Sequence, residues 1–161
     1  MTHAPAAGPQ PAPTLELVAT LVVQVGQPLD VGDTPQGQRR VIPILGGTVQ
    51  GPLLHGTVLP GGADFQLVRS ATHTEIQARY VIETEVGQRI YVENTGIRVG
   101  AAVDITRLLR GEPVDPARIY FRTHPRLETS APELSWINEH LFVGTGARYP
   151  DRVELRFYKV G

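Results

Sequence analysis

The residues best suited to acid–base chemistry lie around a glycine-rich corner. Asp64 and Gln66 follow Gly61-Gly62-Ala63, and because side chains alternate along a strand, they share one face while Phe65 takes the other. A carboxylate that accepts a proton, beside an amide that holds a carbonyl or hydroxyl, can form a catalytic pair. A second interpretation stays open, in which the Asp64 side chain only caps the backbone of the turn.

The strand expected over residues 74–85 adds a tyrosine. Alternation places Tyr80 with Ile76 and Ala78 on the apolar face, and Arg79 on the opposite face. A phenol in an apolar cavity can donate a hydrogen bond to a developing oxyanion or enolate. The alternative for Tyr80 is a core tyrosine whose hydroxyl is bonded to backbone, and Arg79 on its own face can be a surface charge.

The next expected strand, residues 89–98, contributes an amide and a carboxylate. Asn94 shares a face with Ile90 and Val92, whereas Glu93 takes the other face. Both lie near the end of the strand and are expected at the mouth of the fold. Glu93 can serve as a general acid or base if burial raises its pKa toward neutrality. It can equally be a solvated surface glutamate.

A second polar cluster follows between residues 120 and 138. The planar fork of Arg122 suits a carboxylate, which Glu128, Asp64 or an acidic substrate could provide. An internal pair of Arg122 and Glu128 that pins the loop is the alternative. Trp136 and Asn138 stand two residues apart in a short helical segment and therefore on different sides of it. Trp136 is either a lid over the barrel mouth or core packing at its end.

These candidates must be positioned by strands, because period-2 patterns dominate the chain. Strands are expected over residues 15–25, 40–45, 48–59, 64–70, 74–85, 89–98, 119–123, 141–146 and 152–160. Short helices are expected over 104–111, with Asp104 as N-cap, and over 132–138. About eight or nine strands in one domain favour an all-β fold, a closed antiparallel barrel, since closure removes exposed edges.

Length and composition agree with one barrel domain, residues 14–161, behind a disordered leader, residues 1–13. The leader lacks the basic start and apolar run of a signal or anchor, so a cytoplasmic location without membrane association is expected. The formal net charge of -1 and the lack of a basic–aromatic run argue against nucleic acid as a partner.

No cofactor or metal is expected either. Cysteine is absent, and the five histidines show none of the spacings typical of metal ligands. The sequence also lacks the serine elbow of hydrolases, the phosphate-loop lysine and the glycine pattern of dinucleotide-binding folds. Any chemistry must therefore come from the side chains themselves.

Several short motifs occur in order along most of the chain after about residue 14. They are Arg39 to Gln66 with its glycine pairs, Ala78-Arg79-Tyr80, Glu93 to Arg98, Tyr120 to Thr123, Leu127 to Thr129 and Trp136 to Asn138. Together they resemble the signature of domain of unknown function 3237, a family of small bacterial β-barrel proteins. Phe65 stands where that family usually has Trp, and Val86-Gly87 where it usually has Asp-Gly.

The resemblance implies a fold similar to allene oxide cyclase barrels and marks Arg79 as a possible partner for a carboxylate, but it implies no reaction. The leading hypothesis is a small-molecule site in the barrel that acts as a cofactor-independent isomerase, cyclase, lyase or hydratase. The alternatives are a carrier for a small apolar ligand, and a structural module for homo-oligomer formation. Convergence of Asp64, Tyr80, Arg79 and Arg122 on one cavity would favour the enzyme.

Overall fold

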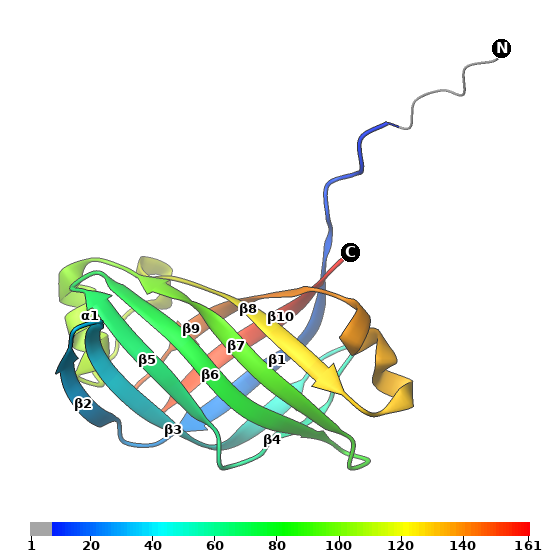
Figure 1. The fold of residues 1–161 in the computed structure, drawn as a ribbon, viewed down its shortest axis with the longest axis horizontal. Helices are drawn as coiled ribbons and strands as arrows, with labels where there is room; N and C mark the ends of the chain where they lie inside the picture. The colour runs from blue at the N-terminus through cyan, green and yellow to red at the C-terminus, as the bar shows by residue number, and fades with distance from the viewer. Residues whose placement is uncertain (1–7) are drawn as a thin grey trace.

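Ten antiparallel strands wrap around one apolar interior in the computed structural model, which describes residues 8–161 (Figure 1). The strands are β1 (Leu15–Val25), β2 (Leu29–Thr34), β3 (Gly37–Gln50), β4 (Gly56–Val58), β5 (Ala63–Ser70), β6 (His73–Thr84), β7 (Arg89–Val99), β8 (Tyr120–Thr129), β9 (Phe142–Arg148) and β10 (Arg152–Val160). The helices are α1 (Ala102–Leu109) and the short 3-10 helices η1 (Pro116–Arg118) and η2 (Pro132–Glu139).

The sheet closes on itself, as the sequence predicted. Its order runs β1-β10-β9-β8-β7-β6, β4 and β5 each pair with both β6 and β3, and β3 returns to β1. Residues 8–14 have no regular secondary structure and extend away from the barrel (Figure 1). The remainder of the predicted leader, residues 1–7, lies outside the described residues.

The strands differ from the expectation in the bounds of β3 and in the presence of β2, which raises their number from nine to ten. The glycine pair Gly46-Gly47 does not end a strand but lies within β3, where Leu45 is an extra residue opposite β1. The strands approach so closely there that a Cβ on Gly47 would lie 2.2 Å from the carbonyl oxygen of Val22. The second difference is β2, which was not expected at all; its Leu29 and Val31 are both exposed.

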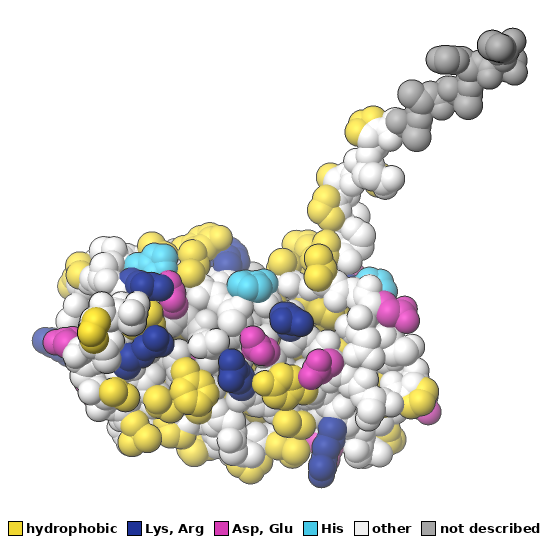
Figure 2. Space-filling view, viewed as in Figure 1, with side chains coloured by type: hydrophobic (Ala, Val, Ile, Leu, Met, Phe, Trp, Pro, Cys, Tyr) yellow, Lys and Arg dark blue, Asp and Glu magenta, His cyan; other side chains and the backbone are white. Residues whose placement is uncertain are grey.

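Alternation along the strands separates an inner from an outer face. On β6 the side chains of Ile76, Ala78, Tyr80 and Ile82 are buried, as expected from the sequence, and Arg79 is exposed. The outer face over β5 to β8 carries mixed basic, acidic and apolar side chains (Figure 2). The inner face therefore forms the core, and the polar side chains that enter it need a separate explanation.

The two ends of the barrel are covered differently (Figure 1). At one end η2 packs Ile137 into the core. At the other end lies α1, which buries Ile105 and Leu108 in a smaller cluster of its own. Asp104 is not the N-cap of α1, because the helix begins at Ala102; its buried carboxylate instead pairs with Arg118 at 3.0 Å. None of the helices in residues 8–161 is long and apolar enough to cross a membrane.

Candidate functional site

A cluster of polar side chains interrupts the apolar interior toward the α1 end. It lines a pocket of about 40 Å³ whose other walls are aliphatic side chains and Phe121. Gln66, Arg98 and Arg148 line both this pocket and a wider mouth cavity of about 700 Å³, which the C-terminal residues of α1 border. The polar members of the interior pocket are Asp64, Gln66, Tyr80, Asn94, Arg98 and Arg148.

Asp64 is fixed by a local opening in the β5–β6 ladder. Paired positions are found at Asp64 and Leu67 of β5, but not at the two residues between them. In that gap the Asp64 carboxylate accepts the backbone N–H of Gln77 at 3.0 Å and the side-chain amide of Gln66 at 2.8 Å. The carboxylate thus replaces a backbone acceptor on the neighbouring strand; it does not cap the glycine corner.

Burial raises the pKa of the Asp64 carboxyl above its ordinary value. The hydrogen bonds from Gln66 and Gln77 and the charges of Arg98 and Arg148 oppose this rise without cancelling it. A carboxyl group with a raised pKa exchanges its proton closer to neutral pH, as a general acid or base requires. Asp64 is therefore the side chain of the pocket best suited to acid–base chemistry.

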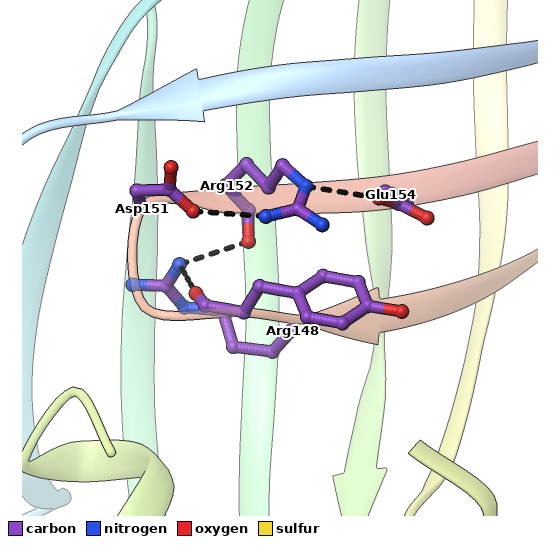
Figure 3. A network of polar contacts seen from close by, with 5 residues as sticks. Arg148, Asp151, Arg152 and Glu154 are labelled. Carbon is purple, nitrogen blue, oxygen red and sulfur yellow. Dashed lines mark hydrogen bonds and ion pairs between the residues drawn. The ribbon is translucent and has the colours of Figure 1, made fainter. Parts of the chain in front are cut away.

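Two arginines face the same space. Arg98 of β7 is only 2% exposed, and its guanidinium carbon lies 5.9 Å from the centre of the Phe121 ring. Burial lowers the pKa of Arg98 to about 10, so the group stays charged at neutral pH. Arg148 ends β9 and donates through Nη1 to the carbonyl oxygens of Tyr149 and Arg152 (Figure 3).

The loop that follows Arg148 is held in place by charge pairs. Arg152 donates to Asp151 at 3.1 Å and to Glu154 at 2.9 Å, and its guanidinium stacks over the ring of Tyr149 (Figure 3). A third arginine, Arg40 of β3, lies in the mouth and donates to the carbonyl oxygen of Leu109 at 3.1 Å. The mouth is thus ordered around arginine side chains.

Several buried polar atoms in the pocket have no hydrogen-bond partner among residues 8–161. They are Gln66 Oε1, Tyr80 Oη, Asn94 Oδ1 and Arg98 Nε. Burial, with the nearby Asp64 charge, raises the pKa of the Tyr80 phenol well above its usual range, so the phenol keeps its proton as a donor. Unpaired buried polar groups are rare in folded proteins and mark places where a ligand or water completes the bonding. No three His, Asp or Glu side chains within the described range gather in a group that could hold a metal ion.

Similarity to known proteins shows the family to which the chain belongs. Residues 13–160 match the family described as protein of unknown function (DUF3237). The chain belongs to this family. A UPF0311 protein of Rhodopseudomonas palustris is 48% identical over 150 residues, which cover 92% of this chain and 98% of that protein. A UPF0311 protein of Clostridium acetobutylicum is 42% identical over 146 residues, or 90% and 92% of the two chains.

Solved structures agree with the fold. A protein of unknown function from Rhodopseudomonas palustris superimposes with a TM-score of 0.90 at 45% identity, covering 94% of this chain and all of that one. A β-barrel-like protein from Acinetobacter baumannii gives 0.83 at 37% identity, with 95% and 99% covered. An enzyme from Penicillium herquei gives 0.70 at 19% identity, with 96% and 100% covered, a likeness of fold alone. The family and the closed barrel predicted from the sequence are confirmed.

The DUF3237 barrel wall places several predicted site residues outside the pocket. Glu93 lies on the outer face, where it forms a cross-strand pair with Arg79 at 4.0 Å. The expectation that Glu93 lies at the mouth as a buried acid is therefore wrong, because alternation turns it outward beside Asn94. Arg79 accordingly meets its carboxylate on the surface.

Arg122 also takes the outer face of the DUF3237 barrel. Its guanidinium stacks on the Tyr120 ring at 5.2 Å and donates to the carbonyl oxygen of Phe121. Arg122 and Asp64 therefore do not share a cavity, and the expectation that they converge is wrong. Glu128 is exposed on the same strand, and no ion pair joins it to Arg122 within residues 8–161.

The residues of η2 pack at the end of the barrel opposite the pocket. Trp136 packs against Phe142 with ring centres 6.2 Å apart, so the core-packing interpretation holds and the lid does not. Asn138 accepts from the backbone N–H of Thr129 and donates to its carbonyl oxygen, both at 2.9 Å. Both residues stabilise the end opposite the pocket.

Arg98 and Arg148 were not among the site residues predicted from the sequence. A signal for both exists, because each continues the inward phase of its strand: Arg98 follows Asn94 by four residues, and Arg148 follows Gly144 by four. Extending the alternation to the last residue of each strand would have placed two arginines inside the DUF3237 barrel.

Proposed function

We propose that the protein is an enzyme that moves a proton on a small organic molecule inside the barrel, with Asp64 as the general acid–base. The observation that carries the proposal is the Asp64 carboxyl, buried with a raised pKa in a pocket that also contains polar side chains without hydrogen-bond partners among residues 8–161. A carboxylate with a purely structural role would not be stabilised by facing donors and acceptors that remain unpaired. Perturbed acids in such pockets are typical of proton-transfer sites.

The chemistry follows from the neighbouring side chains. Ionised Asp64 removes a proton from a carbon next to a carbonyl, and the C–H electron pair moves into the carbonyl to give an enolate. The Tyr80 hydroxyl can donate to the oxygen that gains negative charge, and the nearby positive charges of Arg98 and Arg148 lower the energy of the anion. Protonated Asp64 then returns the proton.

The class of reaction depends on where the enolate electrons go next. Return of the proton to a different carbon is an isomerisation, attack on an electrophilic carbon of the same molecule is a cyclisation, and expulsion of a group from the β-carbon is a lyase reaction. None of these steps needs an oxidant or reductant. The enzyme from Penicillium herquei has the same fold, but that likeness supports no particular reaction.

A carrier without chemistry is the second candidate, and the mainly apolar lining of the interior pocket favours it. A carrier binds its ligand equally well when Asp64 cannot transfer a proton. A substitution of Asp64 therefore distinguishes the enzyme from the carrier.

The test is exchange of carbon-bound hydrogen for deuterium in D₂O, followed by NMR on a panel of small ketones, 1,3-dicarbonyl compounds and keto acids. We expect the wild type to speed exchange of at least one compound and Asp64→Asn to slow it by about 100-fold or more. The amide that Asp64→Asn introduces can be accommodated, because the Gln66 amide can rotate to present its unpaired oxygen. Glu93→Gln, on the outer face, is the matched control and should keep the wild-type rate.

Two outcomes would contradict the proposal. One is exchange no faster than in buffer for every compound of the panel. The other is equal rates for the wild type and Asp64→Asn, which would leave the carrier function.

A further inference from the structure

Arg98 is a buried charge without a protein partner. Within residues 8–161 its guanidinium forms no hydrogen bond, its Nε is unpaired, and no carboxylate oxygen lies within ion-pair distance. Among these residues its guanidinium stacks on the Phe121 ring. Charges are normally buried only when paired, because the desolvation penalty amounts to several kcal/mol. The missing partner of Arg98 is thus expected to come from outside the chain.

The surroundings of Arg98 add positive charge. Arg40, Arg98 and Arg148 line the mouth together, and each of the other two lowers the pKa of Arg98 by repulsion. Of the acids that face them, Asp64 has a pKa that burial raises and that the charges of Arg98 and Arg148 lower, and it forms no ion pair with either among residues 8–161. Rim residue Asp30 accepts hydrogen bonds from Gly32 and Gln38, rim residue Asp151 pairs with Arg152, and Arg110 adds a further positive charge. The charge of Asp64 opposes this positive charge at depth, but one carboxyl group does not balance three guanidinium groups.

We propose that the pocket binds a small organic carboxylate, with its carboxylate group on Arg98 and Arg148. The inference rests on the proposed function in taking this pocket as the substrate site, but binding itself does not require Asp64 to react. The planar fork of arginine matches two carboxylate oxygens, and Arg98, whose Nε has no partner among residues 8–161, lines the pocket.

The sizes of the two cavities set how the ligand enters. The interior space of about 40 Å³ is close to the ~30 Å³ that one water occupies in the liquid, so it admits a small group only. The mouth, at about 700 Å³, matches ordinary ligand pockets of roughly 300–1,000 Å³. The carboxylate end therefore enters first, and the body of the molecule stays in the mouth against Leu45, Leu108 and Leu109.

The mouth favours a monoanionic carboxylate over a phosphate. Phosphate sites commonly use the N–H groups of a helix N-terminus. Here α1 presents its C-terminal residues 108–111 to the mouth, and the Leu109 carbonyl oxygen is held by Arg40. A helix C-terminus carries partial negative charge, which disfavours a dianion.

The first experiment compares probes of one shape by calorimetry on the full chain at pH 7. Benzoate, neutral benzamide and phenyl phosphate share the ring and differ in the head group. We expect benzoate to bind about tenfold or more tightly than either of the others, as loss of charged hydrogen bonds or a mismatched dianion predicts. Equal affinities for benzoate and benzamide, tighter binding of phenyl phosphate, or no benzoate binding up to about 10 mM would each overturn the proposal.

The second experiment locates the probe. Arg98→Met should weaken benzoate binding by about tenfold or more, while Arg122→Met, on the outer face, should leave it unchanged. Arg98→Lys keeps the charge but loses the fork, so it provides an intermediate affinity should the Met variant fail to fold. Unchanged benzoate affinity in Arg98→Met or Arg98→Lys would refute the site.

Asp64→Asn separates the two proposals. The variant should bind benzoate as well as the wild type or more tightly, because a negative charge is removed beside the ligand, while losing deuterium exchange. Selective benzoate binding without any deuterium exchange would support the carboxylate site and contradict the proposed enzyme. Deuterium exchange without selective benzoate binding would support the enzyme and contradict the carboxylate site.

Discussion

The inner and outer faces of the barrel wall hold arginines in opposite states. Outside, Arg79 pairs with Glu93 and Arg122 stacks on Tyr120, all in contact with solvent. Inside, Arg98 is buried and has no partner among the described residues. An exposed pair contributes about 0–1 kcal/mol and needs no function to explain it. A buried unpaired charge lowers stability, so Arg98 on the inner face is better explained by a function than by a contribution to folding.

This contrast depends on strand phase. Glu93 and Asn94 are neighbours, yet one lies outside and the other lines the pocket. A shift of one residue in register would exchange the two faces completely. Substitutions on the two faces should therefore have very different effects on stability.

Gly62→Val should give the largest loss, about 3 kcal/mol or more in free energy of unfolding. A Cβ there would lie 2.4 Å from the carbonyl oxygen of Arg79 and 2.7 Å from Cβ of Tyr80, so the corner that turns Asp64 inward could not close. Gly61→Val faces open space and suffers only from its φ of 106°, which predicts a smaller loss of about 1–3 kcal/mol. Urea unfolding measures both; equal stability of wild type and Gly62→Val would show that the corner is not tightly packed.

Arg98→Met should stabilise the ligand-free protein by about 1–3 kcal/mol, because an unpaired buried charge is replaced by an apolar chain of similar length. The melting temperature should rise by about 2–4 °C per kcal/mol. Arg122→Met is the comparison on the outer face and should change little. A clear loss of stability in Arg98→Met would mean that Arg98 has a structural role, and the contrast between the faces would fail.

Asp64→Asn should change the pH dependence of stability. Since burial raises the folded-state pKa of Asp64, its contribution to stability is fully present below the ordinary Asp pKa of about 3.9 and is lost as pH rises through the raised value. The Asn variant does not titrate there. Its melting temperature relative to wild type should therefore rise between about pH 4 and pH 8. A relative melting temperature that falls over this interval would indicate a lowered pKa.

The smallest effect is expected for the outer pair. Arg79→Met and Glu93→Gln, alone or together, should each change the free energy of unfolding by less than about 0.5 kcal/mol, with little coupling between them. A double-mutant cycle in denaturant measures this. Coupling above about 1 kcal/mol would mean that the outer face also contains strong electrostatic interactions.

Much of the fold could be predicted because β-strands with one buried face have a clear period. β6 and β7 alternate cleanly, and β1 has the expected bounds, although a register shift between Leu17 and Ala19 buries both Val18 and Ala19. β2 could not be found in this way: its residues LDVGDT are rich in Asp and Gly, and none of them is fully buried, so no apolar face marks the strand. The extent of β3 was hidden by glycines that serve close strand contact rather than a turn.

The candidate site was accessible from the sequence only in part. Alternation placed Asp64 and Gln66 on one face and Tyr80 and Asn94 on apolar faces, where the structure has them. It could not show that these strands face one another across the barrel, nor which end is closed, so Trp136 was left open between lid and packing. Arg122 was favoured for its chemistry, although its position between buried Phe121 and Thr123 already indicates the outer face.

If the proposals are right, ligands bind in the interior pocket and not on the outer surface of the barrel. A crystal structure of the full chain with benzoate would show where the ligand binds. We expect the carboxylate within hydrogen-bond distance of Arg98 and Arg148, close to Asp64, with the ring in the mouth beside Leu108 and Leu109. Benzoate bound instead in the outer groove that Arg122 and His124 line, with the interior unchanged, would contradict the account.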